Sequence, residues 1–148
     1  MKFKSICKRI ADRLGIEPLD IKFEEMIDDS RLYIKEEYVG INKKFESNYE
    51  ECAKAIAHEY RHVFQFFYIN LFPGDRSYRW RKEMSDAVNT SNINETGFNY
   101  INQEIELDAF AFTKFYLETF ESIQVHNRIT GLDSIIDKYI IINNEVFY

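Results

Sequence analysis

The 148-residue chain contains only two cysteines, Cys7 and Cys52, which are too few for a disulfide framework. We expect both to be reduced thiols in the core. Five glycines and two prolines exclude a collagen-like or low-complexity protein. Basic residues never occur more than two in a row, and the net charge is −6. The composition therefore predicts that nucleic acid is not a partner.

Long hydrophobic runs are also missing from the sequence. The most apolar stretch, residues 139–142, is much shorter than the roughly 18 residues that a membrane-spanning helix needs. The basic residues near the N-terminus are not followed by the apolar stretch of a signal peptide. We therefore expect no membrane partner and a cytoplasmic location. Hydrophobic residues make up 45% of the chain, which suffices for one core and predicts a single domain over residues 1–148.

The spacing of apolar residues predicts an α+β fold. Helical spacing occurs in residues 3–14, 47–70, 76–88, 100–121 and 132–142, and a polar loop is expected over residues 89–99. Between residues 21 and 45 the runs are short and alternating, which predicts two or three antiparallel strands. Ser47 and Glu50 have the spacing of a capping box, so the second helix is expected to begin there.

Residues 58–62 read His58-Glu59-Tyr60-Arg61-His62, which is a His-Glu-x-x-His motif. Four residues along a helix return a side chain to the same face, so both imidazoles can reach one ion. Glu59 is rotated by about 100° from His58 and can take a proton from a metal-bound water. Both histidines fall outside the apolar stripe of their helix, so they are either metal ligands or solvated surface residues.

A catalytic zinc site needs a third protein ligand besides a water molecule. His126 is the other histidine of the chain, but the helix over residues 100–121 offers carboxylates. On its helical wheel Glu104 and Asp108 fall inside the apolar sector, and Glu106 falls on the polar side. A buried carboxylate is costly unless it is paired or bound to a metal. We therefore expect Glu104 and Asp108 to face the two histidines, and Glu106 to be solvated.

The motif at residues 58–62 followed by Glu-x-x-x-Asp on a later helix resembles the gluzincin metallopeptidases. Residues 104–111, Glu-Ile-Glu-Leu-Asp-Ala-Phe-Ala, are also similar to a segment of small zincin domains of the ImmA/IrrE type, although Leu107 stands where that family has alanine. The resemblance implies a minimal zincin fold. Such a fold has an N-terminal helix, a small antiparallel sheet, an active-site helix and a second helix that carries the glutamate ligand.

The same resemblance implies the role of each site residue. It assigns Zn²⁺ to His58, His62 and Glu104, the general base to Glu59, and the orientation of a ligand histidine to Asp108. The implied activity is that of a zinc metallopeptidase, a hydrolase acting on a peptide or protein substrate. The alternative is a catalytically restricted zincin that acts as a zinc-stabilised interaction protein, an antirepressor or a toxin-like protein with one specific partner.

Two features of substrate binding stay open in the sequence. The resemblance implies an edge strand along the cleft, for which residues 38–45 are the candidate, and an extended peptide can add to such an edge. The donor that stabilises the oxyanion is not determined among Tyr68, Tyr78, Tyr100 and His126. The basic and aromatic segment of residues 76–81 is either a substrate-binding patch or a solvated helix face around one buried tryptophan.

Overall fold

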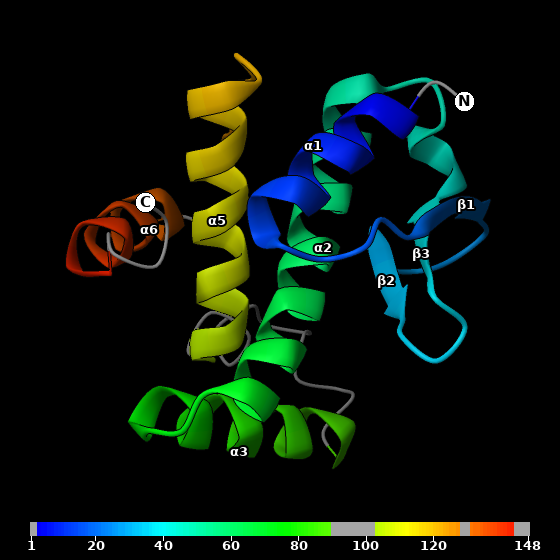
Figure 1. The fold of residues 1–148 in the computed structure, drawn as a ribbon. Coiled ribbons are helices and arrows are strands. Elements are labelled where there is room, and N and C mark those ends of the chain that lie inside the picture. The colour runs from blue at the N-terminus through cyan, green and yellow to red at the C-terminus, as the bar shows by residue number, and fades with distance from the viewer. Residues whose placement is uncertain (1–2, 90–102, 128–130, 144–148) are drawn as a thin grey trace.

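Helices α1 (Lys4–Leu14), α3 (Asp75–Asn89) and α5 (Glu104–Phe120) pack against α2 (Tyr49–Leu71), and a small sheet lies on one side of α2 (Figure 1). The computed structural model describes residues 3–89, 103–127 and 131–143. Helix α6 (Leu132–Ile142) follows them in the chain. The strands are β1 (Asp20–Glu24), β2 (Ser30–Tyr33) and β3 (Tyr38–Asn42), which is followed by a 3₁₀ turn, η1 (Lys43–Phe45). The α+β class is confirmed, and the predicted loop lies outside the described residues from residue 90 onward.

Helix α2 is enclosed by the other elements on most of its sides. It packs against α1 and the sheet on one side and against α5 on the other, while α3 crosses the ends of α2 and α5 and α6 covers α5 (Figure 1). Small residues are buried on both helices, since Ala57 on α2 and Ala109 and Ala111 on α5 have 0% of their surface exposed. The side chain of Asn48 accepts the Glu51 N–H at the start of α2, so Asn48 is the N-cap in place of the predicted Ser47.

The order of the strands differs from the expectation. β3 lies between β1 and β2, pairing in parallel with β1 and antiparallel with β2. The prediction of an antiparallel sheet is therefore wrong for β1. Residues 25–29 connect β1 to β2 and leave a gap of one strand between them. β3 follows β2 in the sequence and fills this gap, next to both strands. The predicted edge strand over residues 38–45 is also wrong, because β3 is central and residues 43–45 form η1.

Other residues cover both faces of β3, as is typical of a central strand. Val39 and Ile41 are buried in the core shared with α1 and α2. On the other face, a Cβ atom at Gly40 would lie 2.9 Å from Glu24 Oε2 and 3.0 Å from Tyr33 Cε2. Glycine at this position therefore leaves room for the side chains of Glu24 and Tyr33. The edges of the sheet are β1 and β2, and β2 contacts α2.

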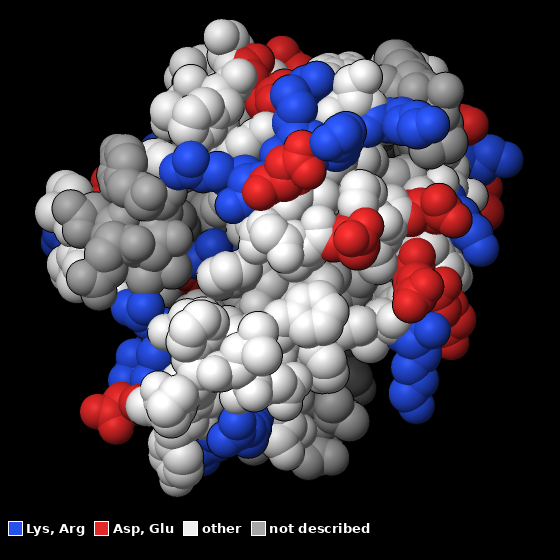
Figure 2. All heavy atoms as spheres, viewed as in Figure 1, with Lys and Arg blue, Asp and Glu red and all other residues white. Residues whose placement is uncertain are grey.

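The remaining composition-based expectations concern thiols, membranes and charge. Cys7 and Cys52 are free and buried, as predicted. None of the described helices combines the length and apolar character that crossing a bilayer requires. Figure 2 shows basic and acidic side chains interspersed over α1 on the face that it displays.

Candidate metal centre

His58, His62 and Glu106 come together where α2 faces the first turn of α5. His58 Nε2 lies 3.2 Å from Glu106 Oε2, and His62 Nε2 lies 2.9 Å from Glu106 Oε1. One ligand atom from each of the three residues lies within 4.8 Å of the other two. The i,i+4 spacing of the histidines on α2 and the first turn of α5 produce this convergence. The described residues thus contain a group that can hold one metal ion.

The donor set of this group suits zinc. Two imidazole nitrogens and one carboxylate oxygen are the ligands of His₂Glu catalytic zinc sites, which leave one position for water. Burial opposes the charge on Glu106, but the neighbouring His62 and His58 hold its pKa well below its usual range. Burial likewise opposes the charge on His62, whose pKa Glu106 nevertheless raises to about 10. The carboxylate of Glu106 therefore stays charged. It needs a positive charge beside it, which either a protonated histidine or a metal ion can supply.

Glu59 lies next to this group on α2 and is buried, with 7% of its surface exposed. Its Oε2 atom has no hydrogen-bond partner among the described residues. Burial raises the pKa of the carboxyl group, and positive charge on His62 and His58 opposes that shift. An unpaired buried oxygen is costly unless another molecule binds there. A water molecule held at the metal position is such a partner, which is the expected arrangement for a general base.

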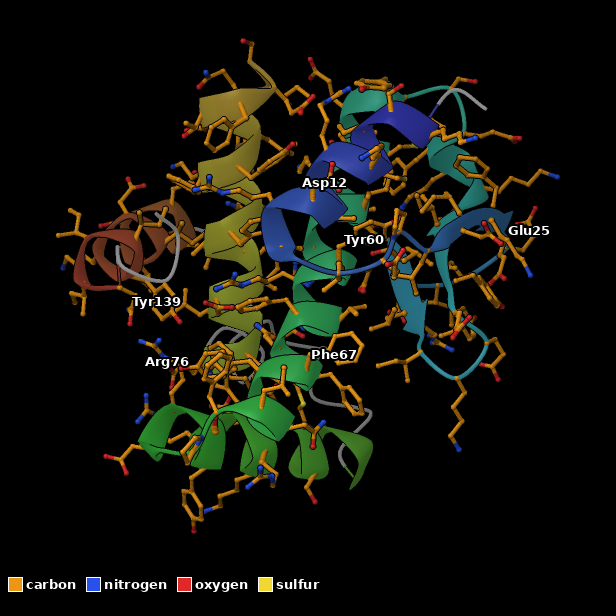
Figure 3. All side chains as sticks on the ribbon, viewed as in Figure 1. Asp12, Glu25, Tyr60, Phe67, Arg76 and Tyr139 are labelled. Atoms are coloured by element: carbon orange, nitrogen blue, oxygen red, sulfur yellow. The ribbon has the colours of Figure 1, made fainter. Side chains whose placement is uncertain are left out.

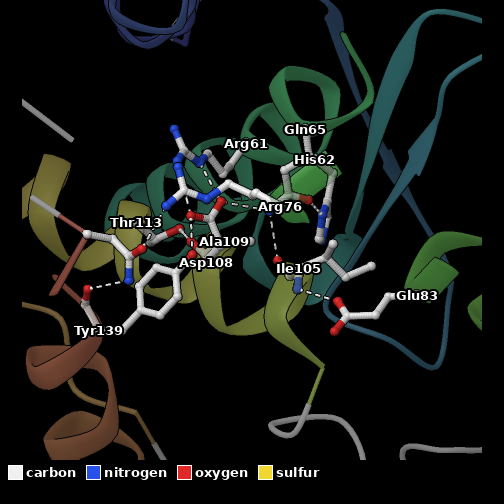
Figure 4. Close-up of polar contacts among 11 residues, drawn as sticks. Arg61, His62, Gln65, Arg76, Glu83, Ile105, Asp108, Ala109, Thr113 and Tyr139 are labelled. Carbon is white, nitrogen blue, oxygen red and sulfur yellow. Dashed lines mark hydrogen bonds and ion pairs between the residues drawn. The ribbon is translucent and has the colours of Figure 1, made fainter. Parts of the chain in front are cut away.

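Glu104, the third ligand expected from the sequence, lies elsewhere. Its carboxylate accepts two hydrogen bonds from Arg79 of α3, at 2.8 and 3.2 Å, and its side chain is 21% exposed. Its backbone N–H donates to Glu83 of α3 at 2.8 Å, as does the N–H of Ile105 (Figure 4 shows the latter). Glu104 therefore joins the start of α5 to α3 and does not reach the histidines.

Glu106 takes the place that was expected for Glu104, and its predicted solvation is wrong. It is buried, with 8% of its surface exposed. Residues four, seven and eleven positions later share its face of α5, namely Phe110, Thr113 and Leu117, and the last two are buried. The Phe110 ring packs against the His58 ring with centroids 4.7 Å apart. This spacing was the sequence signal for Glu106, and it was missed because other faces of α5 are also apolar.

Asp108 is fully buried as expected, but its contacts differ from the predicted one. It accepts two hydrogen bonds from Arg61, at 2.7 and 3.1 Å, and one from the Tyr139 hydroxyl at 2.9 Å. Among the described residues, neither His58 nor His62 donates a hydrogen bond to Asp108. Gln65 stands between them, since it contacts both Asp108 and His62 (Figure 4). Sequence reasoning did not assign Gln65 any role.

The other sequence candidates lie outside the metal group. Tyr78 and His126 are exposed, and Tyr100 lies outside the described residues. The ring of Tyr68 packs against that of Trp80 with centroids 5.2 Å apart, which is a structural contact. No described tyrosine is therefore assigned as an oxyanion donor.

The basic and aromatic segment of residues 76–81 has structural contacts. Trp80 is fully buried, Arg79 pairs with Glu104, and Arg81 donates to the backbone oxygen of Ile69. The sequence left two interpretations of this segment, a substrate-binding patch or a helix face around a buried tryptophan. The structure supports the helix face.

In comparisons with known proteins, the chain matches no family model, no curated protein and no solved structure. The resemblance to zincins thus rests on the motif at residues 58–62 and the segment over residues 104–111. The site itself rests on the geometry described above. Three converging ligand groups beside an unpaired buried carboxylate make this the candidate functional centre of the protein.

Proposed function

We propose that the protein is a zinc-dependent metallopeptidase with a minimal zincin fold. His58, His62 and Glu106 hold the metal, and Glu59 is the general base. Zinc in such a site activates a water molecule and polarises the carbonyl group of the scissile bond. The observation that carries the proposal is the buried, unpaired Oε2 of Glu59 beside three residues with the donor set of a catalytic zinc site.

Glu59 supplies the proton transfers of the reaction. Its Oε2 takes a proton from the attacking water and later returns it to the leaving amine. Burial raises the pKa of this carboxyl above its ordinary value, which is the direction that favours a general base at neutral pH. Glu106 and the two histidines lie close enough to Glu59 to shift the pKa of its carboxyl group. The charges of the proposed ligands and of the proposed base therefore depend on one another.

An extended polypeptide is the proposed substrate. β2 is an edge strand that contacts α2, so a peptide can pair with its outer backbone groups along the helix that carries the two histidines. This edge replaces β3, which the sequence suggested for the role. Figure 3 shows Phe67 on the side of α2 that faces the sheet, and 47% of the surface of this residue is exposed. An exposed aromatic ring there favours apolar side chains in the substrate.

Replacing Glu59 with glutamine tests the division of roles. We expect the Glu59→Gln protein to bind zinc as the wild type does, because the ligand atoms are unchanged. Peptide hydrolysis should fall by about 10²–10⁴-fold, the usual contribution of a general base. Metal analysis and peptide cleavage, measured on the same preparation, check both expectations. Loss of zinc from Glu59→Gln would show that Glu59 is a ligand.

Cleavage mapping tests the proposed activity and its rival. Denatured and folded proteins are incubated with the zinc-loaded enzyme, and the cut sites are identified by mass spectrometry. Glu59→Gln serves as the matched control for contaminating proteases. We expect cuts in denatured chains and in the flexible loops of folded ones. Cuts in one folded protein with denatured chains untouched would favour the single-partner alternative, and no cuts at all would contradict the peptidase proposal.

A further inference from the structure

The ring of His62 has a second contact besides the one with Glu106. Its Nδ1 atom lies 2.8 Å from Oε1 of Gln65, which follows three residues later on α2. Its Nε2 atom lies on the opposite side of the ring, 2.9 Å from Glu106. Gln65 is fully buried, with 0% of its surface exposed. The imidazole is therefore held between a carboxylate on one side and an amide on the other.

The orientation of the Gln65 amide is determined by α5. The amide nitrogen donates to the backbone oxygen of Ile105 and to Asp108 Oδ2, both at 2.8 Å. A backbone carbonyl and an ionised carboxylate can accept hydrogen bonds but cannot donate them. The NH₂ group must therefore face α5, which leaves Oε1 facing His62 (Figure 4). Because Oε1 only accepts, Nδ1 of His62 carries the proton and Nε2 is the nitrogen that can bind a metal.

Asp108 is in turn held in place by groups from two other helices. Arg61 of α2 donates two hydrogen bonds to its carboxylate, at 2.7 and 3.1 Å. The hydroxyl of Tyr139 on α6 donates a third at 2.9 Å. A chain of buried and partly buried hydrogen bonds thus runs from Tyr139 through Asp108 and Gln65 to His62 (Figure 4).

We infer that Gln65 is the positioning residue of the metal centre, and that Asp108 acts on His62 through it. This inference rests on the metal binding in the proposed function but not on peptidase activity. Gln65 selects the nitrogen of His62 that binds the ion and holds the ring with Nε2 next to Glu106. Outer hydrogen bonds of this kind orient metal-bound histidines and raise their basicity. α6 contributes to the centre through Tyr139, although it supplies no ligand.

Zinc affinity of a Gln65 variant is the first test. Gln65→Met keeps the length of the side chain and removes both its acceptor and its donors. We expect zinc affinity, measured by competition with a chelator, to fall by about 10–100-fold. Thr113→Val is the matched control, because its buried hydroxyl bonds only to Ala109 of the same helix among the contacts resolved. It should bind zinc as the wild type does. Wild-type affinity in a folded Gln65→Met protein would overturn the inference.

A second measurement uses the wild type and does not depend on how a variant folds. Nitrogen–proton NMR correlation of the zinc-loaded protein assigns the proton and the metal to the two ring nitrogens of His62. We expect a protonated Nδ1 and a metal-bound Nε2. Zinc on Nδ1 would overturn the inference while leaving the metal centre intact. A wild type that binds no zinc at all would instead contradict the proposed function together with this inference.

Discussion

Replacing Glu106 with alanine is expected to remove zinc from the protein, whereas the same change at Glu104 leaves it bound. Glu106 places its two carboxylate oxygens 3.2 and 2.9 Å from the Nε2 atoms of His58 and His62. Without it two histidines remain, which is an incomplete ligand set for zinc. The affinity should fall by more than the roughly 10–100-fold that loss of an outer contact costs. Metal analysis after dialysis against a weak chelator measures the difference.

Glu104→Ala is a stringent control because the two glutamates are two residues apart on one helix. Its loss breaks the contact with Arg79, which is half-exposed, so we expect a small loss of stability and about one zinc per chain. Zinc lost from Glu104→Ala and kept by Glu106→Ala would mean that α5 is rotated relative to the position described here.

Replacing Asp108 with asparagine is expected to lower the free energy of unfolding by about 3–5 kcal/mol. The change keeps the shape of the side chain but removes the charge that compensates the guanidinium of Arg61, which is 1% exposed. A buried charge without its partner is strongly destabilising. The amide of asparagine would also bring a donor to Gln65 and Tyr139, which both donate to Asp108. Urea denaturation followed by circular dichroism measures the effect.

Asp12→Asn provides the control for this substitution. Asp12 pairs with Lys8 one turn earlier on α1, and both side chains are largely exposed. Solvent screens such a pair, so the variant should unfold at nearly the same urea concentration as the wild type. Equal stability of the Asp108→Asn and Asp12→Asn proteins would show that the buried pair contributes little to the fold.

The helices and the His-Glu-x-x-His motif could be predicted from the sequence because both depend on local spacing. α1 begins one residue after its predicted start and ends where predicted, and α6 matches the prediction at both ends. The order of the strands could not be predicted. Strands of four or five residues carry an alternating pattern that is the same for parallel and antiparallel pairing, and their neighbours depend on distant parts of the chain.

The carboxylate that joins His58 and His62 was predicted to be Glu104 and is Glu106 in the structure, for a similar reason. α5 contacts α2, α3 and α6, so apolar residues occur on most of its faces and the helical wheel has no single apolar side. Glu104 and Glu106 were therefore distinguished by a weak signal. Gln65 was missed because a glutamine carries no motif of its own. Its role appears only when α5 brings Ile105 and Asp108 against its amide.

Zinc-edge diffraction from crystals of protein purified without a metal-affinity tag locates a bound zinc ion and identifies its ligands. We expect one anomalous peak about 2.0–2.1 Å from Nε2 of both His58 and His62 and about 2.0–2.2 Å from a carboxylate oxygen of Glu106. Glu104 should remain with Arg79. A zinc-free site at the two histidines, or a peak whose third protein ligand is a residue other than Glu106, would contradict the proposed zinc site.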